Sequence, residues 1–151
     1  MLITDLRAAS LDRLEAIYAG EGPVLVPAGL FRGEVLAWLP RPADQRLLTR
    51  PLLWAMFGLS PFGVDFDRRR WYFLSPRAPR LGHFVPVIGP SRWRDATTIQ
   101  LHYQVSRLPR PIRATLYDEV KPLRDGLCLG LGGLDAGRGP GEQFFFALER
   151  V

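Results

Sequence analysis

The stretch Gly29-Leu30-Phe31-Arg32-Gly33 opens the part of the sequence that decides the fold. It leads into residues 30–39, where side chains alternate with the two-residue period of a β-strand. One face of this predicted strand carries Phe31, Val35, Ala37 and Leu39, and the other carries Arg32, Glu34, Leu36 and Trp38.

Two glycines and one aromatic residue define the expected role of this stretch. Gly29 allows the chain to turn into the strand, and Gly33 removes a side chain where the strand bends or another backbone approaches. The large side chain of Phe31 is expected to fill the closed end of a barrel. We therefore interpret the segment as the entrance to a β-barrel, with a folding role rather than a functional one.

Seven further strands are predicted downstream, separated by turn sequences such as Asp67-Arg68-Arg69 and Arg124-Asp125-Gly126. Together with 30–39 they make eight, a number that can close into an antiparallel barrel holding side chains or one small ligand. The predicted fold class is therefore mainly β. The seven ranges are 63–67, 70–75, 82–88, 97–105, 112–121, 126–134 and 143–150.

Two helices are expected outside the strands. Ser10 is a good N-cap for an amphipathic helix that ends at Gly20. A second short helix is predicted near 49–58, where Thr49 can cap it and Pro51 suits its first turn. Because that helix is apolar all round, we expect it to be buried or to cover the mouth of a cavity.

The composition predicts one globular domain over residues 1–151 and excludes several classes of protein. Apolar runs are too short to insert into a bilayer, and the acidic N-terminus does not fit a signal peptide. The single Cys128 permits no internal disulfide, so a cytoplasmic protein with a buried thiol is expected. With two histidines, one cysteine and no phosphate or dinucleotide motif, no metal and no cofactor is predicted.

The net charge of +5 comes almost entirely from arginine. Its densest run, residues 68–70, is expected to form a solvated hairpin turn, and no nucleic-acid-binding module accompanies it. Docking of anionic partners at this turn remains the weaker alternative. A haem ligated by His83 or His102 is a second alternative that the composition leaves open. The sequence predicts no particular oligomeric state.

Several short motifs in a shared order resemble the GXWXG-motif family, a group of small proteins without an established activity. Residues 29–33 match its signature except that Phe31 replaces the tryptophan, and residues 61–66 resemble the family's second motif although Val64-Asp65 replaces the lysine region. Residues 116–118, 129–130 and 145–150 resemble its later strands. The resemblance implies a lipocalin-like (calycin) barrel and supplies no reaction.

Three residues are candidates for acid–base chemistry. Asp118 shares the apolar face of its predicted strand, where a carboxylate needs a partner or a raised pKa. We expect a structural ion pair with an arginine, with a pocket acid or base as the alternative. His102 lies on a polar face that meets either solvent or a polar lumen, and Tyr103 follows it on the apolar face.

The functional hypothesis is a binding protein for a small hydrophobic or amphipathic molecule, because the chain has abundant aromatic residues and no catalytic motif. The alternative is a cofactor-free cyclase or isomerase that uses proximity, with acid–base help from Asp118, His102 or Tyr103. The residues expected to contact the ligand are Trp54, Phe57, Phe84, Leu116 and Phe145.

Overall fold

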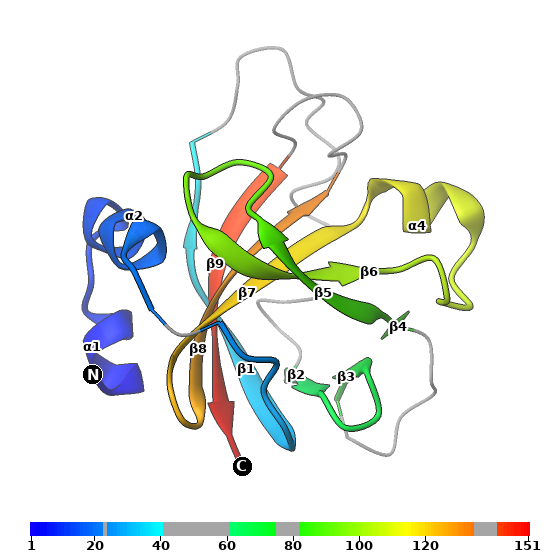
Figure 1. Ribbon diagram of the computed structural model, residues 1–151, viewed down its shortest axis with the longest axis horizontal. Helices are drawn as coiled ribbons and strands as arrows, with labels where there is room; N and C mark the ends of the chain where they lie inside the picture. The colour runs from blue at the N-terminus through cyan, green and yellow to red at the C-terminus, as the bar shows by residue number, and fades with distance from the viewer. Residues whose placement is uncertain (23, 41–60, 75–81, 135–141) are drawn as a thin grey trace.

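The computed structural model describes residues 1–22, 24–40, 61–74, 82–134 and 142–151, and its nine described strands form one antiparallel sheet rolled into a nearly closed barrel (Figure 1). The predicted helix near 49–58, with Trp54 and Phe57, lies outside the described residues. The strand order is β4-β3-β2-β1-β9-β8-β7-β6-β5. The strands are β1 (Leu30–Trp38), β2 (Phe62–Asp65), β3 (Arg70–Phe73), β4 (Gly82–His83), β5 (Val85–Pro90), β6 (Thr97–His102), β7 (Tyr117–Arg124), β8 (Leu127–Leu134) and β9 (Glu142–Arg150).

The two ends of the described sheet, β4 and β5, form the one seam of the barrel, and Phe84 lies between them in the chain. This residue separates β4, which pairs with β3, from β5, which pairs with β6. A single predicted strand at 82–88 is therefore divided between the two ends of the sheet. That division explains why the described part of the chain has nine strands where the sequence predicted eight, and the barrel class itself is confirmed.

The prediction of a strand over 112–121 is wrong in its first half. Residues 110–115 form the helix α4 (Arg110–Thr115), and β7 begins only at Tyr117. Pro111 suits the first turn of a helix, and apolar residues at Ile112 and Leu116 satisfy a four-residue period as well as a two-residue one. The strand predicted at 97–105 likewise ends at His102, because the amide of Ser106 turns back to the carbonyl of Tyr103.

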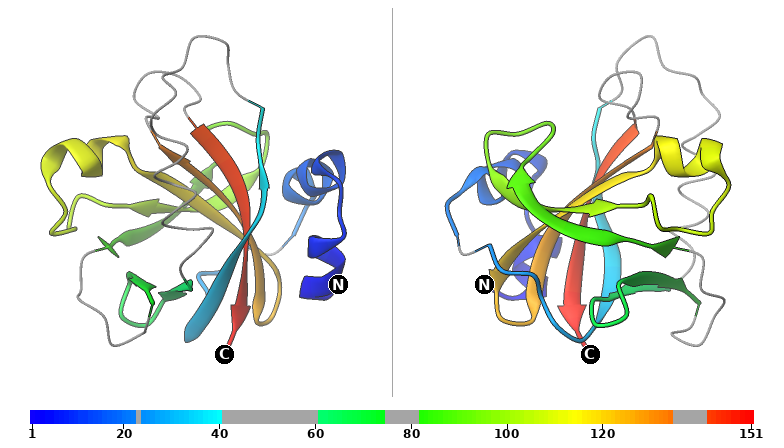
Figure 2. Two further views of the ribbon diagram at one scale, coloured as in Figure 1. Left: turned by 180° about the vertical axis from the view of Figure 1, so that it is seen from behind. Right: turned by 45° about the vertical axis from the view of Figure 1, so that its right-hand side comes forward.

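The N-terminus holds two helices, α1 (Ile3–Arg7) and α2 (Leu11–Ala19), which pack on one side of the barrel, opposite α4 (Figure 2). The predicted cap is confirmed, since the Ser10 hydroxyl accepts a hydrogen bond from the Arg13 amide. The five residues of α1 are too few to show helical periodicity, so this helix was not predicted. No described helix is long and apolar enough to cross a membrane.

The sheet buries apolar side chains on both of its faces. The interior cluster lies inside the barrel and contains Phe31, Phe62, Trp71, Phe84, Ile99, Leu101, Tyr103, Val120, Phe144 and Phe146 among others. The outer cluster lies beneath α1 and α2 and includes Leu6, Leu14, Tyr18, Leu127, Leu129, Leu131, Phe145 and Ala147. Because β8 and β9 contribute to both clusters, they read as nearly continuous apolar runs.

The opening stretch behaves as a folding element. Gly29 has φ +97°, a conformation that other residues rarely adopt, and Phe31 is fully buried with its ring edge-on to Phe66 at 5.3 Å. At Gly33 the missing side chain makes room for the ring of Phe62, which would lie 2.2 Å from an added Cβ. The close approach at Gly33 therefore involves an aromatic ring rather than a backbone.

Replacing Gly33 with alanine is expected to destabilise the barrel by about 1–3 kcal/mol, because the new methyl group would displace the ring of Phe62 inside a packed core. The matched control is Gly89→Ala in β5, where the nearest atom to an added Cβ is 3.5 Å away. Urea denaturation measures both variants. Equal stability of the two variants would contradict the packing role of Gly33.

Candidate functional site

A chain of hydrogen bonds crosses the interior of the barrel from β3 to β7. The indole Nε1–H of Trp71 donates to the hydroxyl of Tyr103 at 2.6 Å. The Tyr103 hydroxyl in turn donates to the carboxyl Oδ2 of Asp118. All three side chains are buried, and they come from segments that are distant in sequence. Both hydrogen bonds run in the same direction, from Trp71 to Tyr103 to Asp118, so the Asp118 carboxyl is the final acceptor.

Gly132 provides the space that the Asp118 carboxyl occupies. The two residues are partners across β7 and β8, and an added Cβ at Gly132 would lie 2.7 Å from Oδ1 of Asp118. It would also lie 2.7 Å from the ring of Phe144. At this position the room is taken by the carboxyl group and an aromatic ring.

Burial raises the pKa of Asp118 from 3.8 to about 7. The hydrogen bond from Tyr103 lowers this pKa and the charge of Glu119 raises it, but desolvation is the largest effect. Desolvation, followed by the charge of Asp118, also raises the pKa of Tyr103 well above 10. The expected ion pair between Asp118 and an arginine is wrong for the described residues: the carboxyl is stabilised by a tyrosine hydroxyl and by partial protonation.

A pocket of about 600 Å³ opens beside this chain, between the end of β6 and α4. Tyr103 belongs both to the wall of the pocket and to the hydrogen-bonded chain, so it connects the two. The wall has an apolar part, made by Leu101, Tyr103, Ala114 and Leu116, and a polar part, made by Arg92, His102, Gln104, Arg110, Arg113 and Tyr117.

His102 and Asp118 lie on opposite faces of the sheet. The half-buried ring of His102 contacts its strand neighbours on the outer face, with Nε2 at 2.9 Å from Oε1 of Gln100 and Nδ1 at 3.4 Å from Nε2 of Gln104. Of the three predicted acid–base residues, the structure joins Asp118 to Tyr103 directly. His102 shares only the pocket wall with Tyr103, and Asp118 is not among the described residues that line this pocket.

The residues expected to contact a ligand fall in different places. Phe84 lies inside the barrel at the seam, with its ring edge-on to Phe66 and Tyr103. Leu116 lines the 600 Å³ pocket. Phe145 points to the other face of β9, where its ring packs edge-on against Tyr18 beneath α2 at 5.7 Å. Of the described candidates, Phe84 therefore contacts Tyr103, and Leu116 shares a pocket wall with Tyr103.

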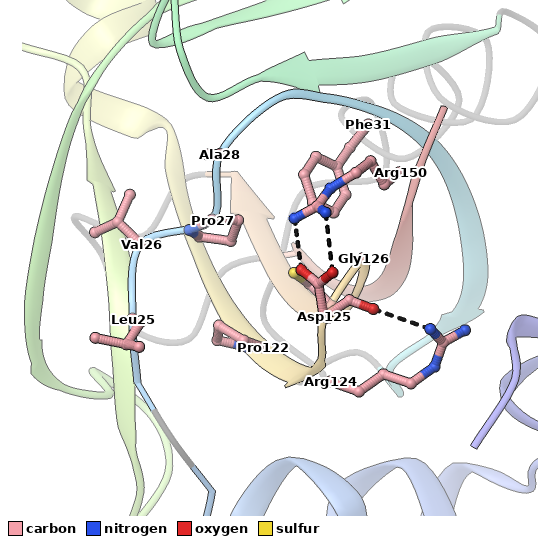
Figure 3. A pocket seen from close by; sticks show the side chains of 11 residues that line it. Leu25, Val26, Pro27, Ala28, Phe31, Pro122, Arg124, Asp125, Gly126 and Arg150 are labelled. Carbon is pink, nitrogen blue, oxygen red and sulfur yellow. Dashed lines mark hydrogen bonds and ion pairs between the residues drawn. The ribbon is translucent and has the colours of Figure 1, made fainter.

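A smaller pocket of about 320 Å³ lies at the other end of the barrel, between residues 25–28 and the β7–β8 turn (Figure 3). Both guanidinium groups of this pocket already have partners. Arg150 forms two hydrogen bonds with Asp125, at 2.7 and 3.0 Å, and lies over the ring of Phe31. Arg124 donates to the backbone carbonyl of Met1 at 2.7 Å. Burial raises the pKa of the Cys128 thiol to about 12, so it stays protonated and unreactive. This pocket thus offers less chemistry than the larger one.

A second buried carboxylate lies on the outer face of β7. Glu119 is fully buried and accepts hydrogen bonds from Ser91 Oγ at 2.6 Å, Thr98 Oγ1 at 2.8 Å and Tyr117 Oη at 3.2 Å. These bonds attach the loop after β5 to the barrel. The two-residue period of a strand places Glu119 on the face opposite to Asp118, but no local pattern in the sequence indicates its three hydroxyl partners.

The basic turn at 68–70 joins β2 to β3, as predicted, but it is not a free cationic patch. Arg70 is buried, with Nε 3.9 Å from Asp65, and Arg68 lies 3.5 Å from the same carboxylate. Within the described residues, no three His, Cys, Asp or Glu side chains come together as metal ligands would.

Sequence reasoning missed Trp71 and three arginines, Arg92, Arg110 and Arg113, which lie at the larger pocket. The contact between Trp71 and Tyr103 could have been predicted only from knowing how the strands pair on the two sides of the seam. Arg110 and Arg113 gave no signal, because a strand was predicted to begin at residue 112 and no helix was expected there. Recognising Pro111 as the first turn of a helix would have placed Arg110 and Arg113 together.

Comparison with known proteins informs the fold alone. No protein-family model matches the chain, and no curated protein matches it. The chain is similar to the crystal structure of a protein from Thermomonospora curvata, with a TM-score of 0.58 and 18% sequence identity over 99% of this chain and 93% of that one. The shared architecture therefore extends over the whole barrel.

The raised pKa of Asp118 predicts how stability depends on pH. Because its pKa of about 7 in the folded state exceeds the ordinary 3.8, the folded protein holds a proton that the unfolded chain releases. This contribution to stability is complete below pH about 4 and falls away as the pH rises to about 7 and above, by up to about 4 kcal/mol.

The Asp118→Asn variant should lack this decline, so its free energy of unfolding relative to wild type should increase with pH. Urea denaturation across this pH range measures the effect. Asp95→Asn removes a carboxylate from an exposed loop and should retain the wild-type pH dependence. The same slope in wild type and Asp118→Asn would show that Asp118 is an ordinary carboxylate.

Proposed function

We propose that the barrel binds a small hydrophobic or amphipathic molecule in the 600 Å³ pocket. The observation that carries the proposal is that this pocket meets the buried Trp71–Tyr103–Asp118 chain through the shared residue Tyr103. Small-molecule sites usually combine a pocket of about 300–1,000 Å³ and an apolar wall with a few positioned polar groups. The pocket has each of these properties.

The hydrogen-bonding capacity of Tyr103 supports a role in orienting the ligand. Its proton goes to Asp118, and one of its two lone pairs accepts from Trp71. Among the described residues nothing else donates to this hydroxyl, so its second lone pair is available to a donor group on a ligand. The apolar contacts would come from Ala114 and Leu116, which still expose surface that the ligand would bury.

The lipocalin-like character implied by the resemblance to GXWXG-motif proteins is part of the same proposal. It is supported by the barrel class and by the folding role of residues 29–33. The barrel alone carries no information about the reaction or the ligand, because one fold serves many functions.

A second candidate function is cofactor-free catalysis, as in a cyclase or isomerase. It is favoured by one observation: Asp118 has a pKa of about 7, which suits an acid or base that works near neutral pH. Tyr103 would hold the Asp118 carboxyl in place through its hydrogen bond. In this scheme Asp118 accepts a proton from a bound substrate as the carboxylate and returns it as the acid.

Filling the pocket should abolish binding. Ala114 is exposed on α4 and lines the pocket, so Ala114→Trp should place an indole in it. We expect the affinity for N-phenylnaphthylamine, a neutral apolar probe, to fall at least about tenfold, because the ligand loses the apolar surface that it would bury.

The matched control is Ala16→Trp, an exposed alanine on α2 away from the pocket. Probe fluorescence measures both variants, and melting curves confirm that each is folded. If wild type binds no probe, or if both variants bind as wild type does, the pocket is not the binding site.

The catalytic candidate has its own test, since a nitrobenzisoxazole opens its ring when a base removes one proton. If Asp118 is an accessible base, wild type should accelerate this reaction with an inflection near its pKa of about 7. Asp118→Asn should lose the acceleration while still binding N-phenylnaphthylamine. Equal rates in wild type and Asp118→Asn would remove the catalytic candidate and leave the binding proposal intact.

A further inference from the structure

We propose that Lys121 is a covalent binding site for a small hydroxyaldehyde, which its side-chain amine captures as an imine. The site lies in a pocket of about 880 Å³ between the end of α2 and the loop that joins β5 to β6, referred to here as the lysine pocket. The inference goes beyond the proposed function, because no described residue lines both this pocket and the 600 Å³ pocket. The observation that carries it is a buried amine in a pocket wall with several polar groups.

Lys121 is the only lysine of the chain, and it lies on the outer face of β7 beside α2. The residue is 3% exposed, although it lines the lysine pocket. Lysine is almost never this buried without a partner for its charge. The ion pairs between described residues all use arginine as the cation. Within that part of the chain, the amine of Lys121 therefore has no carboxylate partner.

The amine is held by two backbone carbonyl groups at the end of α2. Nζ donates to the carbonyl of Tyr18 at 2.8 Å and to that of Gly20. The last carbonyls of a helix have no donor within the helix, so both contacts are favourable. A neutral amine has two N–H groups and one lone pair. It can therefore keep both hydrogen bonds and still present its lone pair to a carbonyl carbon.

Burial favours the neutral form of this amine. Desolvation lowers the pKa of Lys121 below its ordinary 10.5, and the charge of Glu21 opposes this effect. Near neutral pH a larger fraction of Lys121 is thus uncharged than of an exposed lysine. The uncharged amine is the form that forms imines with aldehydes and ketones.

The rest of the wall indicates the chemistry of the ligand. Glu21, Asp95 and Thr97 are exposed at the lysine pocket and offer oxygen atoms that accept hydrogen bonds. Arg94 also lines the pocket, but its guanidinium forms two hydrogen bonds with Glu15, at 2.5 and 2.6 Å. An anionic ligand would meet two carboxylates here, whereas a hydroxyl group can donate to them. A small aldehyde that carries a hydroxyl group therefore suits both the wall and the amine.

Imine formation at this site needs only the aldehyde. The lone pair of Nζ adds to the aldehyde carbon, and one amine proton moves to the oxygen to give a carbinolamine. The C–O bond then breaks, and the oxygen leaves as water with the second amine proton. Protonation of the imine by solvent restores one N–H, which can donate to the carbonyl of Tyr18 or Gly20. The two carbonyls thus favour the protonated imine, and the acids of the wall can relay its protons.

The test uses an internal reference, the variant Arg107→Lys, which adds a lysine at an exposed loop position outside the lysine pocket. The protein is incubated with glycolaldehyde and cyanoborohydride, which reduces an imine to a stable amine. Peptide mass spectrometry measures the rate of alkylation at each amine. At about pH 7 we expect Lys121 to react at least about tenfold faster than the lysine at position 107, because an exposed lysine with a pKa of about 10.4 is almost entirely protonated there. The rate at Lys121 should also reach its plateau at a lower pH.

Propionaldehyde measures the preference for a hydroxyl group, because it replaces the hydroxyl of glycolaldehyde with a methyl group. The ratio of the glycolaldehyde rate to the propionaldehyde rate should be about threefold larger at Lys121 than at position 107, which corresponds to one modest hydrogen bond. Taking the ratio at both positions removes the difference in intrinsic reactivity between the two aldehydes.

Two tryptophan variants, each combined with Arg107→Lys, test the role of the pocket. Ala19 is exposed at the end of α2 and lines the lysine pocket, so Ala19→Trp should remove the advantage of Lys121 over position 107. Ala16→Trp places the same side chain at an exposed position three residues earlier, outside the described lining of the pocket, and should retain the advantage. Melting curves confirm that each variant is folded.

Each part of the proposal can fail separately. If Lys121 reacts no faster than the lysine at position 107, it serves only to hold the end of α2 and the proposal is wrong. The same ratio of aldehyde rates at both positions would contradict a hydroxyaldehyde as the class of ligand. If Ala19→Trp and Ala16→Trp react alike, the aldehyde does not reach Lys121 through the lysine pocket.

Discussion

The hydrogen-bonded chain from Trp71 through Tyr103 to Asp118 is the interaction on which the interior of this barrel depends. A carboxyl group inside an aromatic core is costly unless it is hydrogen-bonded or protonated. Here Asp118 accepts a hydrogen bond from Tyr103, and its pKa of about 7 favours the protonated form below neutral pH. The chain also links β3 with β7 across the interior, because Trp71 and Asp118 both bond to Tyr103 just after β6 ends. Gly132 completes the arrangement by leaving the space that the carboxyl fills.

Two neighbouring acids on β7 show how one strand can serve two environments. Asp118 points into the barrel and relies on one tyrosine, whereas Glu119 points out and relies on three hydroxyl groups. The outward acid fastens the loop that contributes Arg92, and the inward acid contacts the pocket through Tyr103. The site at the end of β6 therefore depends on both faces of the sheet, with α4 supplying its remaining wall.

The sequence predicted the barrel because alternation and turn residues are local signals that repeat along the chain. It also predicted the inward face of Asp118, since the two-residue period from Tyr117 onward is unbroken. Ile112 and Leu116 fit both the two-residue period of a strand and the four-residue spacing of a helix. For this reason a strand was predicted where the structure has the helix α4. The hydrogen bonds that connect Asp118 to Tyr103 and Trp71 could not be predicted from the sequence either. The contact with Trp71 depends on how the strands pair around the seam, and no spacing in the sequence encodes that pairing.

The central claim is that the pocket between β6 and α4 lies next to a buried acid, Asp118, whose pKa is near 7. The most direct measurement is a carbon NMR titration of the side-chain carboxyl signals, with Asp118 assigned by its absence in Asp118→Asn, with and without N-phenylnaphthylamine. The account predicts a midpoint near 7 for the free protein, and a higher midpoint with the probe bound, because the probe removes water near Tyr103 and Asp118. A midpoint near the ordinary 3.8 that does not move when the probe binds would contradict it.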